Sequence, residues 1–264
     1  VRMGEQSAAI PLLQPESAIE WELSSAMKRV SFKDKPVVGL VMGHGEPGMN
    51  LMPQLERSLS VLYGVEPMAI FDSFPIHDRF SALLWLDPKD SIPVAHLQRL
   101  DEFLAKGRGL VIAYSKVTSD LGASPVIDVR NSPLEIWLAG KGLKVGTEAV
   151  IDASCGQVQV LQQRGMYTMQ VPVSFPYFPL ITTFGDHPIS GGLEAVLLQF
   201  STSLSFQGDT SAVRYSPLLV SSPKTGLLQA PHIIDLQRQW TDAQFLSGPR
   251  TVAAALEGLS LIHI

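Results

Sequence analysis

The stretch "VVGLVMGHGEPG", Val37 to Gly48, joins an apolar run to a turn-forming cluster that holds a histidine and a carboxylate. The apolar run Val37–Met42 predicts a strand buried on both faces. The glycines that follow predict a tight turn carrying His44 and Glu46. Ligands of open parallel sheets bind beyond the carboxyl ends of the strands. The turn is therefore either a binding site or simply the point where the strand ends.

Helical and extended patterns alternate on both sides of this stretch. Residues 15–30 and 50–62 each place apolar side chains at helical spacing. The strand candidates "VEPMAIF" and "SALLWL" come first, followed by the helix pattern "PVAHLQRLDEFLAKG" and the strand candidate "GLVIAYS". A second helix pattern, "SPLEIWLAGKG", has Ser132 as N-cap and Gly140 or Gly142 as its end. Strands that alternate with helices are typical of a parallel sheet with helices on both faces.

The pattern changes after about Val145. "VGTEAVID", "GQVQVLQQ" and "YTMQVPVSF" are extended, whereas "FPYFPLITTFGDHPISGG" is too rich in proline and glycine for a regular element. We therefore predict one α/β domain over residues 1–264 with a doubly wound, mainly parallel sheet. Residues 1–144 form its βα-alternating half. Residues 145–264 form a β-rich C-terminal extension that completes the sheet and adds a hairpin at its edge.

Composition excludes several classes of protein. Of the 264 residues, 45% are hydrophobic and 17% charged, as in ordinary globular chains. The net charge of -5 gives no basic surface for nucleic acid. No apolar stretch reaches the roughly 18 residues of a membrane span. The first ten residues lack the order of a signal peptide, and the closing "LEGLSLIHI" has no signal to end an element, so we expect an excised piece of a longer protein.

Two polar loops are the candidate binding sites. In the first, the amides of Gly43 and Gly45 suit an anion or a sugar hydroxyl, His44 suits a hydrogen bond, and Glu46 suits orienting that histidine. We expect His44 and Glu46 to face a cleft. In the second loop, "GDHPISGG", Pro188 holds His187 in an extended conformation. These five residues, Gly43, His44, Gly45, Glu46 and His187, are the predicted ligand- or partner-binding set, and we assign no catalytic residue.

Other chemistries have weaker support. The first loop lacks the lysine and hydroxyl of a P-loop and the three-glycine spacing of a dinucleotide site, so we predict no nucleotide and no cofactor. A zinc site made by His44, His187 and Asp186, or by His232 and Asp235, is an alternative, but no pair has a preorganising helical spacing, and we predict no metal. Cys155, the single cysteine, precludes an intrachain disulfide.

Taken in order, "IEWELSSAMKRV", "KPVVGLVMGHGEP", "LDEFLAKGRGLVIAYS", "LEIWLAGKGLKVGTEAVID", "DHPISGGLEAVLLQFSTSL", "YSPLLVSSP" and "PRTVAAALEG" resemble the GldG-like family. Members are auxiliary components of gliding-motility-type bacterial ABC transport systems. The resemblance covers nearly the whole chain. The "GHGE" of the family corresponds to Gly43, His44, Gly45 and Glu46, and its "HP" element begins at His187.

This resemblance implies a flavodoxin-like or class I glutamine amidotransferase-like fold on the extracytoplasmic, periplasmic side of a bacterial inner membrane. It implies tethering by transmembrane helices outside this chain, the ABC permease and ATPase as partners, and a carbohydrate or other small molecule as a conjectured ligand. The catalytic cysteine and histidine of the amidotransferases have no counterpart. Cys155 leads into extended sequence, whereas that nucleophile sits on a sharp strand-to-helix turn.

Three functional hypotheses follow from the sequence. The leading one is a non-enzymatic binding or scaffold domain that serves an ABC-type transport system. The second is a hydrolase of glycans or peptides, with His44 as base and Glu46 as the group that orients it. The third is an assembly module, a homo-oligomer formed through an exposed edge strand of the β-rich half.

Overall fold

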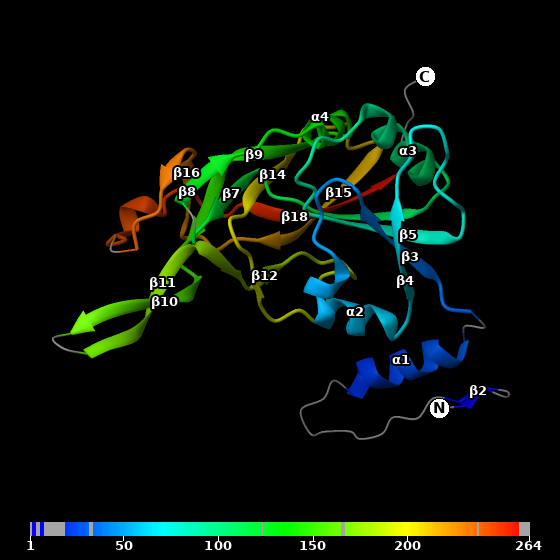
Figure 1. Ribbon diagram of the computed structural model, residues 1–264, viewed down its shortest axis with the longest axis horizontal. Coiled ribbons are helices and arrows are strands. Elements are labelled where there is room, and N and C mark those ends of the chain that lie inside the picture. The colour runs from blue at the N-terminus through cyan, green and yellow to red at the C-terminus, as the bar shows by residue number, and fades with distance from the viewer. Residues whose placement is uncertain are drawn as a thin grey trace. The chain divides into compact units, whose positions relative to one another are not determined.

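The computed structural model describes residues 2–3, 6–7, 19–31, 34–122, 124–164, 167–236 and 238–258. The chain divides into two compact units, Val1–Tyr114 and Ser115–His263, which Figure 1 colours from blue to green and from green to red. Buried apolar side chains occur in both units, so each has a core of its own. No helix within the described ranges is both long enough and apolar enough to span a bilayer.

A parallel sheet of four strands organises the first unit, in the order β4-β3-β5-β6. The apolar run of the opening stretch is its central strand, as predicted. Val37 pairs with Gly64 of β4 on one side and with Phe80 of β5 on the other. The strands are β3 (Val37–Met42), β4 (Gly64–Ala69), β5 (Phe80–Leu86) and β6 (Gly109–Ala113), and a separate two-stranded sheet joins β1 (Arg2–Met3) to β2 (Gln6–Ser7).

Helices lie in two of the three connections between consecutive strands of this sheet. The chain passes from β3 to β4 through a 3-10 turn, η1 (Met49–Leu51), and α2 (Pro53–Ser60), and from β5 to β6 through α3 (Val94–Ala105). Leu97, Leu100 and Phe103 form the buried face of α3 at helical spacing. Residues 70–79, between β4 and β5, contain no helix. The N-terminal helix α1 (Ile19–Ser31) confirms the described part of the helix predicted over 15–30.

The second unit is built from antiparallel strands. Its sheets have the orders β10-β11-β13, β12-β15-β18, β14-β9-β16 and β17-β8-β7. The elements are β7 (Val117–Asp120), β8 (Ser124–Val129), α4 (Pro133–Gly140), β9 (Leu143–Asp152), β10 (Cys155–Arg164), β11 (Tyr167–Ile181), β12 (Thr183–Phe184), β13 (Val196–Leu197), β14 (Thr202–Phe206), β15 (Val213–Val220), β16 (Thr225–Gln229), β17 (His232–Ile233), η2 (Asp242–Gln244) and β18 (Thr251–Gly258).

The boundaries of α4 agree with the sequence signals. Ser132 is the N-cap, and its hydroxyl accepts a hydrogen bond from the Leu134 amide at 3.3 Å. This satisfies one of the amides that a helix start leaves without a partner. The helix ends at Gly140, and Gly142 follows with a φ of +84°.

The core of the second unit overturns one prediction. The "FPYFP" run was expected to be irregular, but β11 continues through it to Ile181. Phe175, Tyr177 and Phe178 are buried there, and the rings of Phe175 and Phe178 meet edge to face with centroids 4.7 Å apart. Burial of these aromatic side chains stabilises an extended conformation that the prolines alone do not favour.

The predicted fold class is wrong. The protein is mostly β, with several small antiparallel sheets and one parallel sheet, and is not a doubly wound, flavodoxin-like or amidotransferase-like α/β fold. In the described chain, parallel pairing ends at β6, and the strands of residues 145–264 pair antiparallel with one another, with β9 or with β8 instead of completing that sheet. Apolar runs reveal that strands exist, but they do not reveal which strands pair or in which direction.

Candidate functional site

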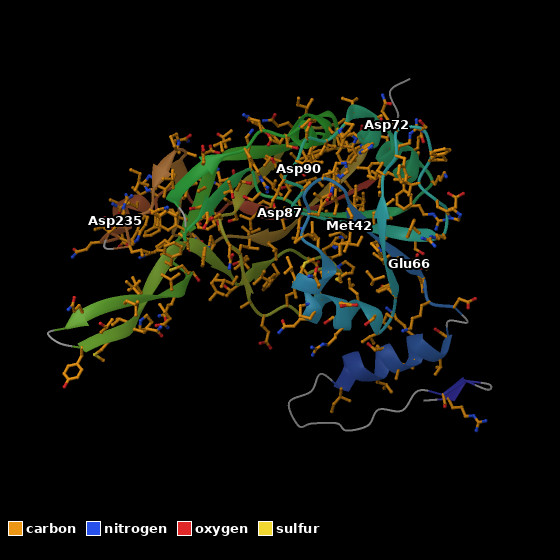
Figure 2. The ribbon with its side chains drawn as sticks, viewed as in Figure 1. Met42, Glu66, Asp72, Asp87, Asp90 and Asp235 are labelled. Carbon is orange, nitrogen blue, oxygen red and sulfur yellow. The ribbon has the colours of Figure 1, made fainter. Side chains whose placement is uncertain are left out.

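The turn after β3 is held in place by backbone hydrogen bonds and by its glycines. The carbonyl of His44 accepts the amides of Lys89 and Asp90 at 2.7 and 2.8 Å. These bonds fasten the turn to the segment that follows the neighbouring strand β5, near Asp90 in Figure 2. Gly43 and Gly45 have φ angles of +115° and +78°, which glycine adopts readily and other residues rarely do. The predicted tight turn is present.

Glu46 is the hub of a buried hydrogen-bond cluster. One carboxylate oxygen, Oε2, accepts the backbone N–H of His44 at 2.6 Å. The other, Oε1, accepts the indole N–H of Trp85 at 2.6 Å and lies 3.0 Å from Nδ1 of His44. The residue is 9% exposed, and Trp85, on β5, is fully buried. Three nitrogen atoms are thus directed at one buried carboxylate, so its oxygens do not lack partners.

His44 continues this cluster toward the surface. It is 2% exposed, and its Nε2 lies 2.8 Å from Nδ1 of His96, on the first turn of α3. The two imidazole rings meet edge to face. Nε2 of His96 in turn lies 3.1 Å from the carboxylate of Asp72, whose side chain is 68% exposed. The residues thus form a continuous polar chain, Trp85–Glu46–His44–His96–Asp72, which we call the histidine relay.

The histidine relay has more links than two neutral imidazoles can supply with hydrogens. Its three links that involve ring nitrogens are Glu46 to His44, His44 to His96, and His96 to Asp72. Each link needs one N–H, because carboxylates only accept hydrogen bonds. Two neutral imidazoles carry two such protons, so the full relay requires one imidazolium. With both imidazoles neutral, one link has no hydrogen.

The link to Asp72 is the weakest of the three. Burial lowers the pKa of His96, and the neighbouring His44 lowers it further, while Asp72 acts in the opposite direction. Positive charge is therefore disfavoured on His96, the only relay residue that touches Asp72. Glu46, by contrast, sits in the buried part and keeps its Trp85 and backbone donors in either protonation state.

This arrangement leaves the predicted binding residues in a different setting from the one expected. His44 and Glu46 are brought together, but both are buried and do not face a cleft. Neither lines the cavity of about 320 Å³ that lies between β4 and residues 70–80. A general base needs a nitrogen within reach of the substrate proton. In His44 one ring nitrogen faces Glu46 and the other faces His96, so neither is open.

His187 belongs to the second unit and has its own partners. Its Nδ1 accepts the amide of Ile189 at 3.2 Å, and its Nε2 lies 3.5 Å from the carboxylate of Glu257 on β18. The hydroxyl of Ser190 closes the loop by bonding the carbonyl of Gly185 at 2.8 Å. The "GDHPISGG" segment is therefore a structured connection in which the histidine joins the loop to β18.

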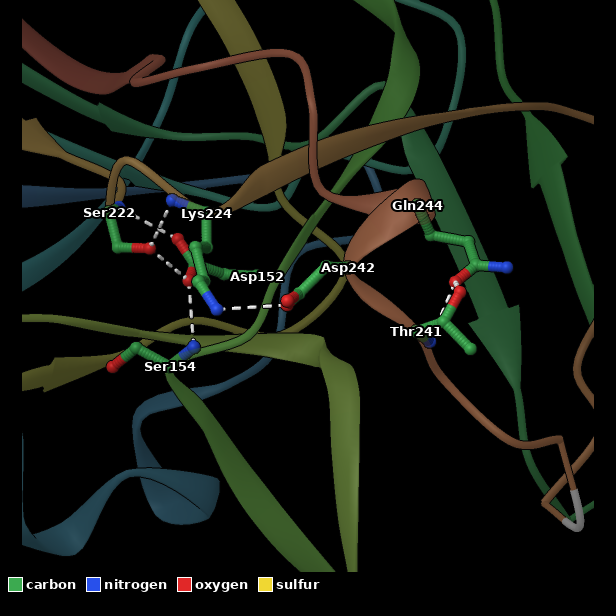
Figure 3. A network of polar contacts seen from close by, with 7 residues as sticks. All are labelled: Asp152, Ser154, Ser222, Lys224, Thr241, Asp242 and Gln244. Atoms are coloured by element: carbon green, nitrogen blue, oxygen red, sulfur yellow. Dashed lines mark hydrogen bonds and ion pairs between the residues drawn. The ribbon is translucent and has the colours of Figure 1, made fainter.

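A second buried polar cluster is centred on Asp152, as Figure 3 shows. This carboxylate is fully buried and accepts the amides of Ser154 and Ser222 at 2.8 and 2.7 Å and the Ser222 hydroxyl at 2.6 Å. Burial raises the pKa of the Cys155 thiol, and the charge of Asp152 adds to that effect. A raised pKa keeps the sulfur in the unreactive thiol form at neutral pH.

The sequence did not single out three members of the relay: Asp72, Trp85 and His96. They come from three different parts of the chain, and the parallel pairing of β3 with β4 and with β5 brings these parts near His44. One available signal was their position, since each follows or ends a strand or begins a helix at the carboxyl edge of the sheet. Within the part of the chain that the structure describes, no group of three or more His, Cys, Asp or Glu is arranged to hold a metal ion.

Comparison with known proteins gives one informative match. No curated protein matches the chain. A solved structure described as "mmIFT52 N-terminal domain" is similar over 71% of this chain and 74% of its own, with 11% identity and a TM-score of 0.49, a likeness too low to support a conclusion about function. The family model described as "ABC-type uncharacterized transport system" matches residues 35–260. The chain therefore belongs to this family of auxiliary components of ABC-type transport systems.

Proposed function

We propose that this chain is a non-enzymatic binding or scaffold domain on the extracytoplasmic side of a bacterial inner membrane, in a membrane-anchored component that assembles with an ABC permease and its ATPase. Membership of the transport family supports the general role. One structural observation favours the scaffold over the hydrolase: both ring nitrogens of His44 are bonded inside the protein. The proposed base thus fixes the fold of the turn and is closed to a substrate.

The relay gives this scaffold a defined architectural part. Through Glu46 it joins the end of β3 to Trp85 of β5, and through His96 it joins the same turn to α3. Hydrogen bonds between buried polar groups specify one arrangement of the surrounding elements. The turn surface, where Gly43 and Gly45 are exposed, is thereby held rigid for a partner or a small ligand.

The test separates assembly from catalysis with two variants at the outer end of the relay. In cells that produce the native full-length protein with an affinity tag, we would measure transport activity and the amount of permease and ATPase that co-purifies. Asp72→Asn and His96→Asn alter the relay without emptying its buried end. A scaffold predicts that transport activity follows the amount of assembled complex in every variant. If a variant assembles fully but loses transport activity more than about tenfold, the non-enzymatic proposal is overturned and the hydrolase is favoured.

The location is tested separately on membranes. Protease added to spheroplasts should digest the domain, whereas protease added to inverted membrane vesicles should leave it intact until detergent is present. An antibody against the domain gives the readout. The permease of the same system serves as the orientation control. The opposite protection pattern would reject the extracytoplasmic placement while leaving the scaffold role to the first experiment.

A further inference from the structure

The β10–β11 hairpin presents a sheet edge that remains available for pairing. The two strands pair continuously from Gln157 with Ser174 to Arg164 with Tyr167. Among the described strands, β10 pairs with β11 alone, so its other edge has no strand partner. Figure 1 shows the hairpin extending beyond the other strands of the second unit. Unpaired backbone N–H and C=O groups along such an edge are a template for another strand.

The two edges of this hairpin differ. The outer edge of β11 carries Pro172, which lacks an N–H and so cannot donate to an added strand. From Cys155 to Gln163, β10 contains neither a proline nor a charged residue. Proline and charge are the usual means by which natural proteins protect an edge. The edge of β10 is therefore the unprotected one.

The register with β11 indicates which groups point outward from β10. Pro172 is opposite Gln159, and a proline fits a ladder position where the backbone nitrogen points away from the neighbouring strand. Pairs of this kind alternate along antiparallel strands. The backbone groups of Gln159, Leu161 and Gln163 therefore point to the free edge, with Leu161 at the centre.

The side chains of β10 are compatible with a second copy of the same strand. In an antiparallel pair with a two-fold axis at Leu161, this residue faces its own copy, and Gln159 faces Gln163. Leu161 is 67% exposed, so such a contact would cover an apolar side chain that is now in water. Glutamine amides both donate and accept, so they can pair with each other.

We infer that β10 is a self-association strand: two copies of this chain pair antiparallel along β10, with Leu161 at the two-fold axis. The four strands then form one continuous sheet, β11-β10-β10-β11. The proposed partner is a second copy because residues 155–163 of the strand carry no charge and are self-complementary in this register. This inference does not depend on the proposed scaffold function, because it is argued only from residues of the second unit.

Cysteine crosslinking tests the register. In a Cys155→Ser background, Leu161→Cys should form an intermolecular disulfide under mild oxidation, since residues facing each other in a hydrogen-bonded antiparallel pair have Cα atoms roughly 5.5 Å apart. Gln170→Cys is the matched control, because Gln170 lies opposite Leu161 on the same face but on β11. It should crosslink at least tenfold more slowly. Equal crosslinking of the two would overturn the proposed register.

Sedimentation equilibrium on the full chain tests the association itself. The wild type should dimerise, and Leu161→Lys should weaken the dimer at least tenfold by placing two lysines opposite each other. Gln170→Lys adds the same charge away from the edge and should leave the dissociation constant within about twofold. A wild type that stays monomeric at all accessible concentrations would reject the inference. So would a Leu161→Lys variant that dimerises normally, or a hairpin whose edge captures only a transporter subunit.

Discussion

His44 is a buried hydrogen-bonding residue whose loss should be felt in stability. His44→Ala removes a donor to the buried Glu46 and a partner of His96. A buried polar group left unsatisfied costs about 1–3 kcal/mol, and more when it is charged. We therefore expect the free energy of unfolding to fall by about that amount or more, measured by urea denaturation.

The matched control is Asp72→Ala, at the exposed end of the same relay. A substitution at an exposed position usually changes stability by less than about 0.5 kcal/mol. If His44→Ala lowered the free energy of unfolding no more than Asp72→Ala does, the buried relay would contribute little to stability. The turn would then again be a candidate recognition site.

Gly45 is constrained both by its backbone and by its neighbour. Its φ is +78°, and a Cβ there would lie 2.9 Å from Oδ2 of Asp90. Gly45→Val places a β-branched residue in the left-handed region, which costs about 1–3 kcal/mol. We expect a loss of at least this size in chemical denaturation. Gly140→Ala is the control, since its Cβ meets open space at the last residue of α4, and it should not lower the stability of the protein. Equal stability of both variants would contradict the strained turn.

At the residue scale, the sequence located the turn but not its chemistry. The pairing of His44 with Glu46 was predictable because the two residues are close in sequence and share a glycine-rich turn. His96 is 52 positions from His44, and Asp72 lies in a segment without regular structure. Contacts of this kind depend on strand pairing, which a single sequence does not reveal.

At the scale of elements, β17 is held against β11 by a neutral histidine. The hydroxyl of Tyr177 lies 3.3 Å and the guanidinium of Arg238 lies 3.2 Å from Nε2 of His232. Both are directed at the same nitrogen, which must therefore be an unprotonated acceptor. Burial lowers the pKa of His232, and the charge of Arg238 lowers it further.

This contact predicts a pH dependence of stability. The pKa of His232 is lower in the folded state than its unfolded value of about 6.5. The contribution of neutral His232 to the stability of the folded state is therefore complete above about pH 6.5. It is lost as the pH falls through the folded pKa. We expect thermal denaturation to show a smaller loss of Tm on acidification for His232→Gln than for the wild type. His77→Gln, at an exposed position, should keep the wild-type slope. Parallel curves for all three proteins would contradict a role for His232.

The elements themselves were largely predictable, and their arrangement was not. Apolar periodicity gave β3, β5 and α3 correctly, because burial of one face or both faces leaves a local pattern. The strand through "FPYFP" was missed, because aromatic packing from distant residues such as Phe200 offsets the local effect of proline. The parallel fold class failed for the same reason: pairing direction is a property of the tertiary structure.

At the scale of the whole molecule, two separate cores predict two unfolding transitions. Leu100 is fully buried in the first unit and Ile151 in the second, where Ile151 belongs to the buried core cluster of that unit. Replacing either by alanine creates a cavity and costs about 2–5 kcal/mol. Because domains with their own cores unfold as units, Leu100→Ala should lower one transition in scanning calorimetry and Ile151→Ala the other. A single transition that both variants shift by the same amount would show that the two compact units unfold as one cooperative domain, as the sequence alone had led us to expect.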